Sequence, residues 1–112
     1  MRDAKLYLAD MLAAINSIQT FTAGQTFEAF QSDDKTMSAV VRKMEIIGEA
    51  ANAVPGEVKE IHPDVPWKDM VGMRNRLIHF YFGIKASVVW DTIQKDLPPL
   101  KKLIEGALSK AE

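Results

Sequence analysis

The chain has 112 residues, of which 47% are hydrophobic, and its formal net charge at pH 7 is −1. This length predicts a single domain over residues 1–112, and this composition excludes a disordered chain. The absence of cysteine excludes disulfides, thiol catalysis and Cys-ligated zinc. The near-neutral charge argues against a protein that grips long duplexes by neutralising phosphates, although it leaves room for a small basic site.

The apolar stretches are too short and too interrupted to span a bilayer. Asp3, Lys5 and Asp10 break the start of the chain, so no signal peptide is predicted. We therefore expect a cytoplasmic protein without a membrane partner.

The first half of the chain is predicted to form two long helices joined by a short one. Apolar residues at helical spacing indicate long helices over residues 2–21 and 34–54, with a short helical turn over residues 26–31. Ser32-Asp33-Asp34 supplies N-cap candidates for the second long helix. Gly48 in that helix lets a neighbouring helix approach closely. The same helix has a polar stripe, formed by Arg42, Glu45, Glu49 and Asn52.

The second half reads as further helices. They are expected over residues 55–61, 66–85 and 86–97, with a last helix from about residue 100 to 108. Pro98-Pro99 is expected to interrupt or kink the chain there. No segment shows the alternation typical of strands. The pattern predicts an all-α fold, an up-and-down bundle of four main helices plus short ones.

Residues 66–85 concentrate the side chains that can do chemistry. At about 100° per residue, Arg74 falls in the middle of an apolar stripe. That stripe is formed by Trp67, Met70, Val71, Leu77, Ile78 and Tyr81. Asn75 and His79 are four residues apart and share a polar stripe. A charge on an apolar face needs a partner or a cleft, so Arg74 either forms a buried ion pair between helices or serves a functional site.

An arginine and a histidine together can cleave RNA without a metal ion. His79 could take the proton of the 2′-OH or give one to the leaving oxygen, and Arg74 could neutralise charge on the phosphate. Asn75 could orient the imidazole or bond a phosphate. No metal-ligand cluster and no Gly-rich phosphate loop is present, so no cofactor is predicted. Acid and base together need two titratable groups, which a two-fold homodimer would supply.

The stretch Arg74-Asn75-Arg76-Leu77-Ile78-His79-Phe80-Tyr81 resembles the signature of HEPN-domain ribonucleases. It is closer still to the HepT-like toxins of HepT–MntA toxin–antitoxin pairs, whose pattern is Arg, four residues, His, one residue, Tyr. The similarity covers roughly residues 3–105. It includes Ile46-Ile47-Gly48-Glu49-Ala50-Ala51-Asn52, Pro66-Trp67, Gly72-Met73, Val89-Trp90 and Asp96-Leu97-Pro98.

This resemblance implies a HEPN-like homodimer, possibly assembling further, whose two motifs line a shared cleft and cut RNA as a toxin. It also implies a partner, a minimal nucleotidyltransferase antitoxin that attaches AMP to the motif tyrosine, which is Tyr81 here. Arg74 and His79 would be the catalytic residues. Asn75, Arg76 and Glu49 would support them.

Other interpretations of the same residues remain open. Glu49 either is solvated or faces the motif helix, of this chain or of a partner chain, and neutralises Arg74. Tyr81 could simply pack in the core. His62, which precedes a proline, is expected to be a loop histidine. The whole protein could instead be a non-catalytic HEPN-type module that binds nucleotide or RNA, or the substrate-binding partner of a nucleotidyltransferase. A purely structural helical dimer is a third alternative.

Overall fold

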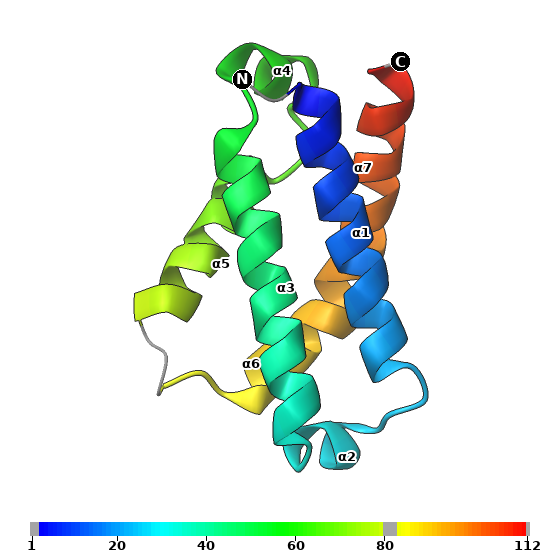
Figure 1. Cartoon of the computed structure of the whole chain (residues 1–112), viewed down its shortest axis with the longest axis vertical. Helices are drawn as coiled ribbons and strands as arrows, with labels where there is room; N and C mark the ends of the chain where they lie inside the picture. Colours follow the sequence, from blue (N-terminus) through cyan, green and yellow to red (C-terminus); the bar gives the residue numbers. More distant parts are fainter. Residues whose placement is uncertain (1–2, 80–82, 112) are drawn as a thin grey trace.

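Helices account for all the regular structure in the computed structural model, which describes residues 3–79 and 83–111. In chain order they are α1 (Ala4–Thr22), α2 (Phe27–Gln31), α3 (Asp34–Ala53), α4 (Gly56–Ile61), α5 (Trp67–His79), α6 (Ala86–Asp91), the π-helical turn η1 (Thr92–Asp96) and α7 (Leu97–Lys110). The main helices are α1, α3, α5 and the unbroken succession of α6, η1 and α7 (Figure 1). The predicted all-α bundle is confirmed.

The helix α3 is the centre of the bundle, because it packs along α1 on one side and along α5 on the other (Figure 1). A further contact between α1 and α7 closes the core. At one end, Phe30 of α2 packs on the ring of Trp90, with ring centroids 5.2 Å apart. The largest fully buried side chains are Leu8, Met11, Ile15, Ile18, Phe30, Val40, Met44, Ile47, Leu97 and Ile104. Burial of these apolar side chains is the main stabilising term of the fold.

Asp33 caps the N-terminus of α3, as the sequence predicts for this segment. Its carboxylate accepts the backbone N–H of Thr36 at 3.0 Å and the hydroxyl of Thr36 at 2.6 Å. The side-chain amide of Gln25 donates a further hydrogen bond at 3.0 Å. These donors, with the Thr36 hydroxyl first, lower the pKa of Asp33 below its ordinary 3.8. The cap fixes where α3 begins and therefore where its later residues face.

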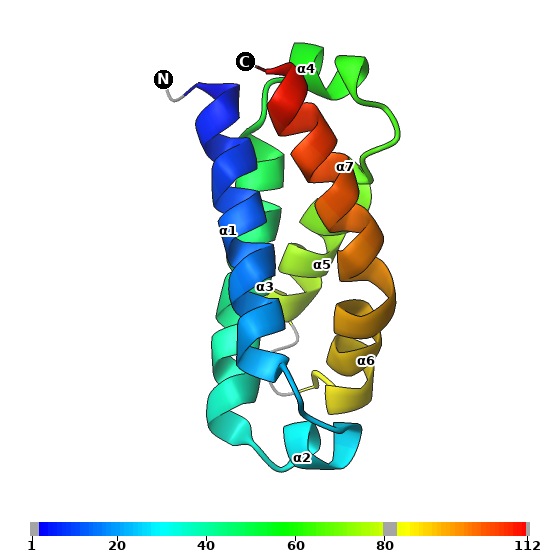
Figure 2. The ribbon, with the colours of Figure 1, turned by 90° about the vertical axis from the view of Figure 1, so that its right-hand side faces the viewer.

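In the succession of α6, η1 and α7, the hydrogen-bonding pattern changes from α-helical to π-helical just before the two prolines. The N–H of Leu97 bonds to the carbonyl of Thr92, five residues back, within the π-helical turn η1. Pro98 and Pro99 follow in the first turn of α7, where missing N–H groups cost little. The predicted interruption therefore lies at residues 92–96, ahead of the prolines, and the chain continues as one rod (Figure 2).

The motif helix is shorter than the sequence predicts. The described part of α5 ends at His79, whereas the prediction ran the helix to residue 85. Gly83 lies in a turn, and Lys85 has extended backbone angles, φ −87° and ψ 133°, so a new helix begins at Ala86. Residues 80–82 lie outside the described residues. The prediction of one continuous helix over residues 66–85 is therefore wrong, because Gly83 lies in a turn and Lys85 has an extended backbone.

Candidate active site

Arg74 is positioned by the crossing of α5 over α3 at Gly48. A Cβ at position 48 would overlap the Cβ of Arg74 and would lie 2.9 Å from the backbone oxygen of Met70. Only a residue without a side chain allows this approach, so the prediction made for Gly48 is confirmed. The crossing holds the base of the Arg74 side chain against α3. Arg74 is half-buried as a result.

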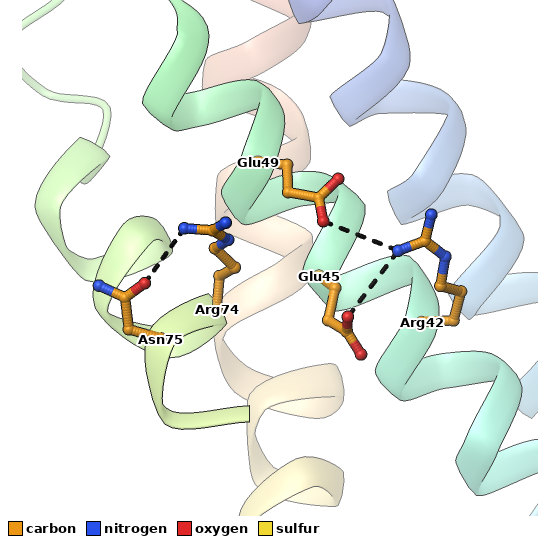
Figure 3. A network of polar contacts seen from close by, with 5 residues as sticks. All are labelled: Arg42, Glu45, Glu49, Arg74 and Asn75. Atoms are coloured by element: carbon orange, nitrogen blue, oxygen red, sulfur yellow. Dashed lines mark hydrogen bonds and ion pairs between the residues drawn. The ribbon is translucent and has the colours of Figure 1, made fainter. Parts of the chain in front are cut away.

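Within residues 3–79 and 83–111, the guanidinium of Arg74 makes one hydrogen bond. Its Nη1 donates a hydrogen bond to Oδ1 of the adjacent Asn75 at 3.2 Å (Figure 3). Its Nε is buried and has no hydrogen-bond partner within residues 3–79 and 83–111. A guanidinium has five N–H donors, and a buried donor without an acceptor costs free energy. An anionic ligand would supply the missing acceptors.

Two acids of α3 that Figure 3 draws beside this arginine, Glu45 and Glu49, pair with Arg42. Oε1 of Glu49 lies 3.7 Å from Nη1 of Arg42, and Oε2 of Glu45 lies 3.8 Å from the same atom. Figure 3 shows both carboxylates directed along α3 toward Arg42, whereas the guanidinium of Arg74 is directed toward Asn75. Among the described residues, Glu49 and Arg74 form no ion pair. The structure thus has Glu49 paired on its own helix, and it does not show the neutralisation of Arg74 considered above.

The three consecutive motif residues 74–76 face three different surroundings, as the rotation of about 100° per residue requires. Arg74 faces α3. Asn75 lines a groove on the α4 side of α5. Arg76 lines cavities on the side of α6 and α7. Within one chain, the side chains of Asn75 and Arg76 therefore line different cavities.

The histidine and the tyrosine of the motif fall at the edge of what the structure describes. His79 is the last residue of α5, four residues after Asn75 and five after Arg74. The helical backbone places it one turn beyond Asn75 on the same side of the helix. The side chain of His79, and Tyr81 as a whole, lie outside the described residues. His62 lies in the loop after α4, as predicted.

The described part of the chain contains no group of three or more His, Cys, Asp or Glu residues that could hold a metal ion. None of its helices combines the length and the apolar character that crossing a bilayer requires.

Sequence reasoning placed Arg42 only in a polar stripe and missed its role as partner of the acids. The sequence spacing does indicate this pairing, because residues three and seven positions apart lie on one face of a helix. Arg42 precedes Glu45 by three residues and Glu49 by seven. What spacing alone leaves undecided is whether Glu49 prefers Arg42 or an arginine on another helix.

The geometry defines a small all-helical protein whose candidate site has an arginine and an asparagine on one turn of a helix and a histidine on the next turn. The family model described as "Ribonuclease HepT-like" matches residues 11–107. The chain belongs to this HepT-like ribonuclease family. The predicted family is thus confirmed.

Similar proteins agree with this assignment. The "Probable ribonuclease HepT" of Thermococcus cleftensis is 46% identical over 104 residues, which cover 93% of this chain and 94% of that protein. A protein of Methanocaldococcus jannaschii, provisionally named an RNase, is 41% identical over 93% of this chain and 95% of its own. Another of Caldanaerobacter subterraneus, named in the same way, is 40% identical over 98% of each chain. No solved structure matches this chain.

Proposed function

We propose that this protein is a metal-independent endoribonuclease and the toxin of a toxin–antitoxin pair. The observation that carries the proposal is the guanidinium of Arg74, which is held at a helix crossing with a buried Nε that lacks a partner among the described residues. Membership of a ribonuclease family supports the substrate class. Fixed arginine donors suit the non-bridging oxygens of a phosphate that gains charge in the transition state.

The proposed reaction is an internal transfer within RNA. The 2′-oxygen attacks the adjacent phosphorus, its proton passes to a base, and the bond to the 5′-oxygen breaks as that oxygen receives a proton from an acid. The products end in a 2′,3′-cyclic phosphate and a 5′-hydroxyl. The imidazole of a histidine can both accept and donate a proton near neutral pH, so His79 suits either proton transfer. Arg74 stabilises the pentavalent phosphate, and Asn75 fixes the guanidinium through its hydrogen bond.

A homodimer would complete the site, because each chain supplies one motif histidine while the reaction needs a base and an acid. The surface of α5 supports this arrangement. Its chief packing partner is α3, and Ile78, next to His79, is 45% exposed. A second copy covering this face would bury Ile78 and bring two motifs to one cleft. Assembly beyond the dimer is compatible with the same interface.

Regulation would act through Tyr81, which follows His79 by two residues. A minimal nucleotidyltransferase antitoxin would transfer AMP to the tyrosine oxygen and release pyrophosphate from ATP. The added phosphate would compete with the RNA backbone for the arginines, and the adenosine would block entry. This part of the proposal rests on the match of the motif to the HepT-like pattern.

The test is cleavage of single-stranded RNA in EDTA by purified wild type, Arg74→Ala and His79→Ala. Each variant should retain its helical circular dichroism and lose about 10²–10⁴-fold in rate, the range typical of general acid–base groups. His62→Ala is the matched control, because it removes the imidazole of a loop residue far along the chain from the motif. Full activity in His79→Ala, or an absolute requirement for Mg²⁺, would refute the proposal. Absence of cleavage by wild type would favour a non-catalytic binding module.

A further inference from the structure

An open groove runs along the α4 side of α5. Its volume is about 720 Å³, and it is bounded by the end of α3, by α4, by the loop before α5 and by the first half of α5. Its apolar lining includes Pro63, Val65 and Val71. Its polar lining consists of Asn52, Lys59, Lys68, Asp69 and Asn75. Cavities of this size hold ligands as large as nucleotides.

Trp67 fixes the walls of this groove relative to one another. Its ring is buried, and its Nε1 donates a hydrogen bond to the carbonyl of His62 at 3.0 Å. The ammonium of Lys59 lies 6.0 Å from the centre of the same ring. One side chain at the start of α5 therefore contacts both the preceding loop and α4. The groove is preformed, which lowers the entropy cost of filling it.

The groove begins at the candidate active site. Asn75 lines it, and the Oδ1 atom of the same residue accepts the hydrogen bond from Arg74. A chain lying in the groove would therefore contact Asn75, the hydrogen-bond partner of the Arg74 guanidinium, at one end. Charge supports a polyanion as occupant, since two lysines and one aspartate line the groove of a protein whose overall charge is −1. Attraction for phosphate in this protein must come from such local clusters.

We propose that this groove binds the single-stranded RNA that flanks the cut phosphate. Lys59 and Lys68 contact backbone phosphates, the apolar lining receives an unstacked base, and the amides of Asn52 and Asn75 hydrogen-bond to the edge of that base. A base must be free of its complementary strand to enter, so the groove selects single strands over duplexes. This inference rests on the proposed function, and it adds the location on the protein surface at which the RNA substrate binds.

The experiment compares two double variants with equal changes of charge. Lys59→Gln with Lys68→Gln alters the groove, while Lys101→Gln with Lys102→Gln alters α7, where neither lysine lines the groove. Both are made in the His79→Ala background, and binding of a labelled 12-nucleotide RNA is followed by anisotropy across a salt series. Loss of two phosphate contacts on a single strand should lower the salt slope by about 1.4 and weaken binding about tenfold. The α7 pair should bind as the background does.

The rate of RNA cleavage by the same two double variants, now with His79 intact, tests this inference separately from the proposed function. The groove pair should raise KM and leave kcat nearly unchanged, because it removes binding that ground state and transition state share. If wild type cleaves RNA and the two pairs behave alike, the groove is not the binding site and the proposed function stands. If a duplex of the same sequence binds as tightly, the inference is also wrong. Lys68→Gln alone, at an exposed position, serves if the groove pair misfolds.

Discussion

Replacing Gly48 with alanine should push α5 away from α3 and disturb Arg74 with it. The new Cβ would meet two groups that cannot rotate away, the Cβ of Arg74 and the backbone oxygen of Met70. The 2.9 Å separation from that oxygen must grow to the 3.4 Å of ordinary contact, which is a movement of about half an ångström at least. The whole of α5 must move, because the Met70 oxygen is part of its backbone and the Cβ of Arg74 is fixed directly to that backbone.

The stability change follows from two opposing terms. Alanine gains about 1 kcal/mol over glycine in a helix interior, whereas overpacking costs about 1–3 kcal/mol, here toward the upper end because no rotamer relieves it. We expect a net loss of about 1–2 kcal/mol in the free energy of unfolding. Gly106→Ala is the matched control, because a Cβ at that position on α7 would have nothing within 4 Å. That variant should gain about 0.5–1 kcal/mol.

Urea unfolding followed by circular dichroism measures both variants, and RNA cleavage is assayed in parallel. Displacement of a catalytic group by an ångström can cost about 10²-fold in rate, so Gly48→Ala should lose more activity than its stability loss explains. Gly106→Ala should cleave as wild type does. A Gly48→Ala protein as stable as Gly106→Ala and fully active would show that the close crossing does not position Arg74.

Three further predictions follow from the site and the cap. Incubation with the nucleotidyltransferase and ATP should add AMP to wild type and none to Tyr81→Phe by intact mass, whereas equal addition to both would mean another acceptor. Sedimentation at micromolar concentration should show a dimer, and a monomer alone would contradict the shared cleft. The lowered pKa of Asp33 means that its ionised form stabilises the fold above pH 3.8, and this contribution is lost as the pH falls through the lowered pKa. Asp33→Ala should therefore show a weaker loss of stability between pH 5 and pH 2 than wild type in acid unfolding; an identical loss would refute the role of this carboxylate.

The helices were predictable because their signals are local. Apolar spacing, the Asp33 cap and the turn residues lie within a few positions of the elements they specify. Even the close approach at Gly48 was predictable, since a glycine inside an amphipathic helix usually has a packing reason. The end of the motif helix was placed too late, because residues 83–85 contain no proline that would show from the sequence that a helix cannot continue to residue 85.

The parts that were not predictable depend on the fold as a whole. The choice of Glu49 between Arg42 and Arg74 depends on how the side chains of α3 and α5 lie against each other, which no spacing within one helix gives. The groove joins Lys59 of α4 to Lys68 of α5 across a loop whose path the sequence does not specify. The π-helical turn at Thr92–Asp96 lies just ahead of the two prolines and next to the buried Leu97, and no spacing in the sequence marks it.

The central claim, that the Arg74 and His79 motif directs attack by the RNA 2′-oxygen, has one direct test. An RNA oligonucleotide is incubated with wild type in EDTA, its cut site is mapped, and the product ends are identified by mass. A second oligonucleotide carries a single 2′-deoxy sugar on the 5′ side of the cut. The account predicts 2′,3′-cyclic phosphate ends from the first and no cleavage at that position of the second. Cleavage of the deoxy substrate at the same phosphate, or products ending in 5′-phosphate, would contradict it.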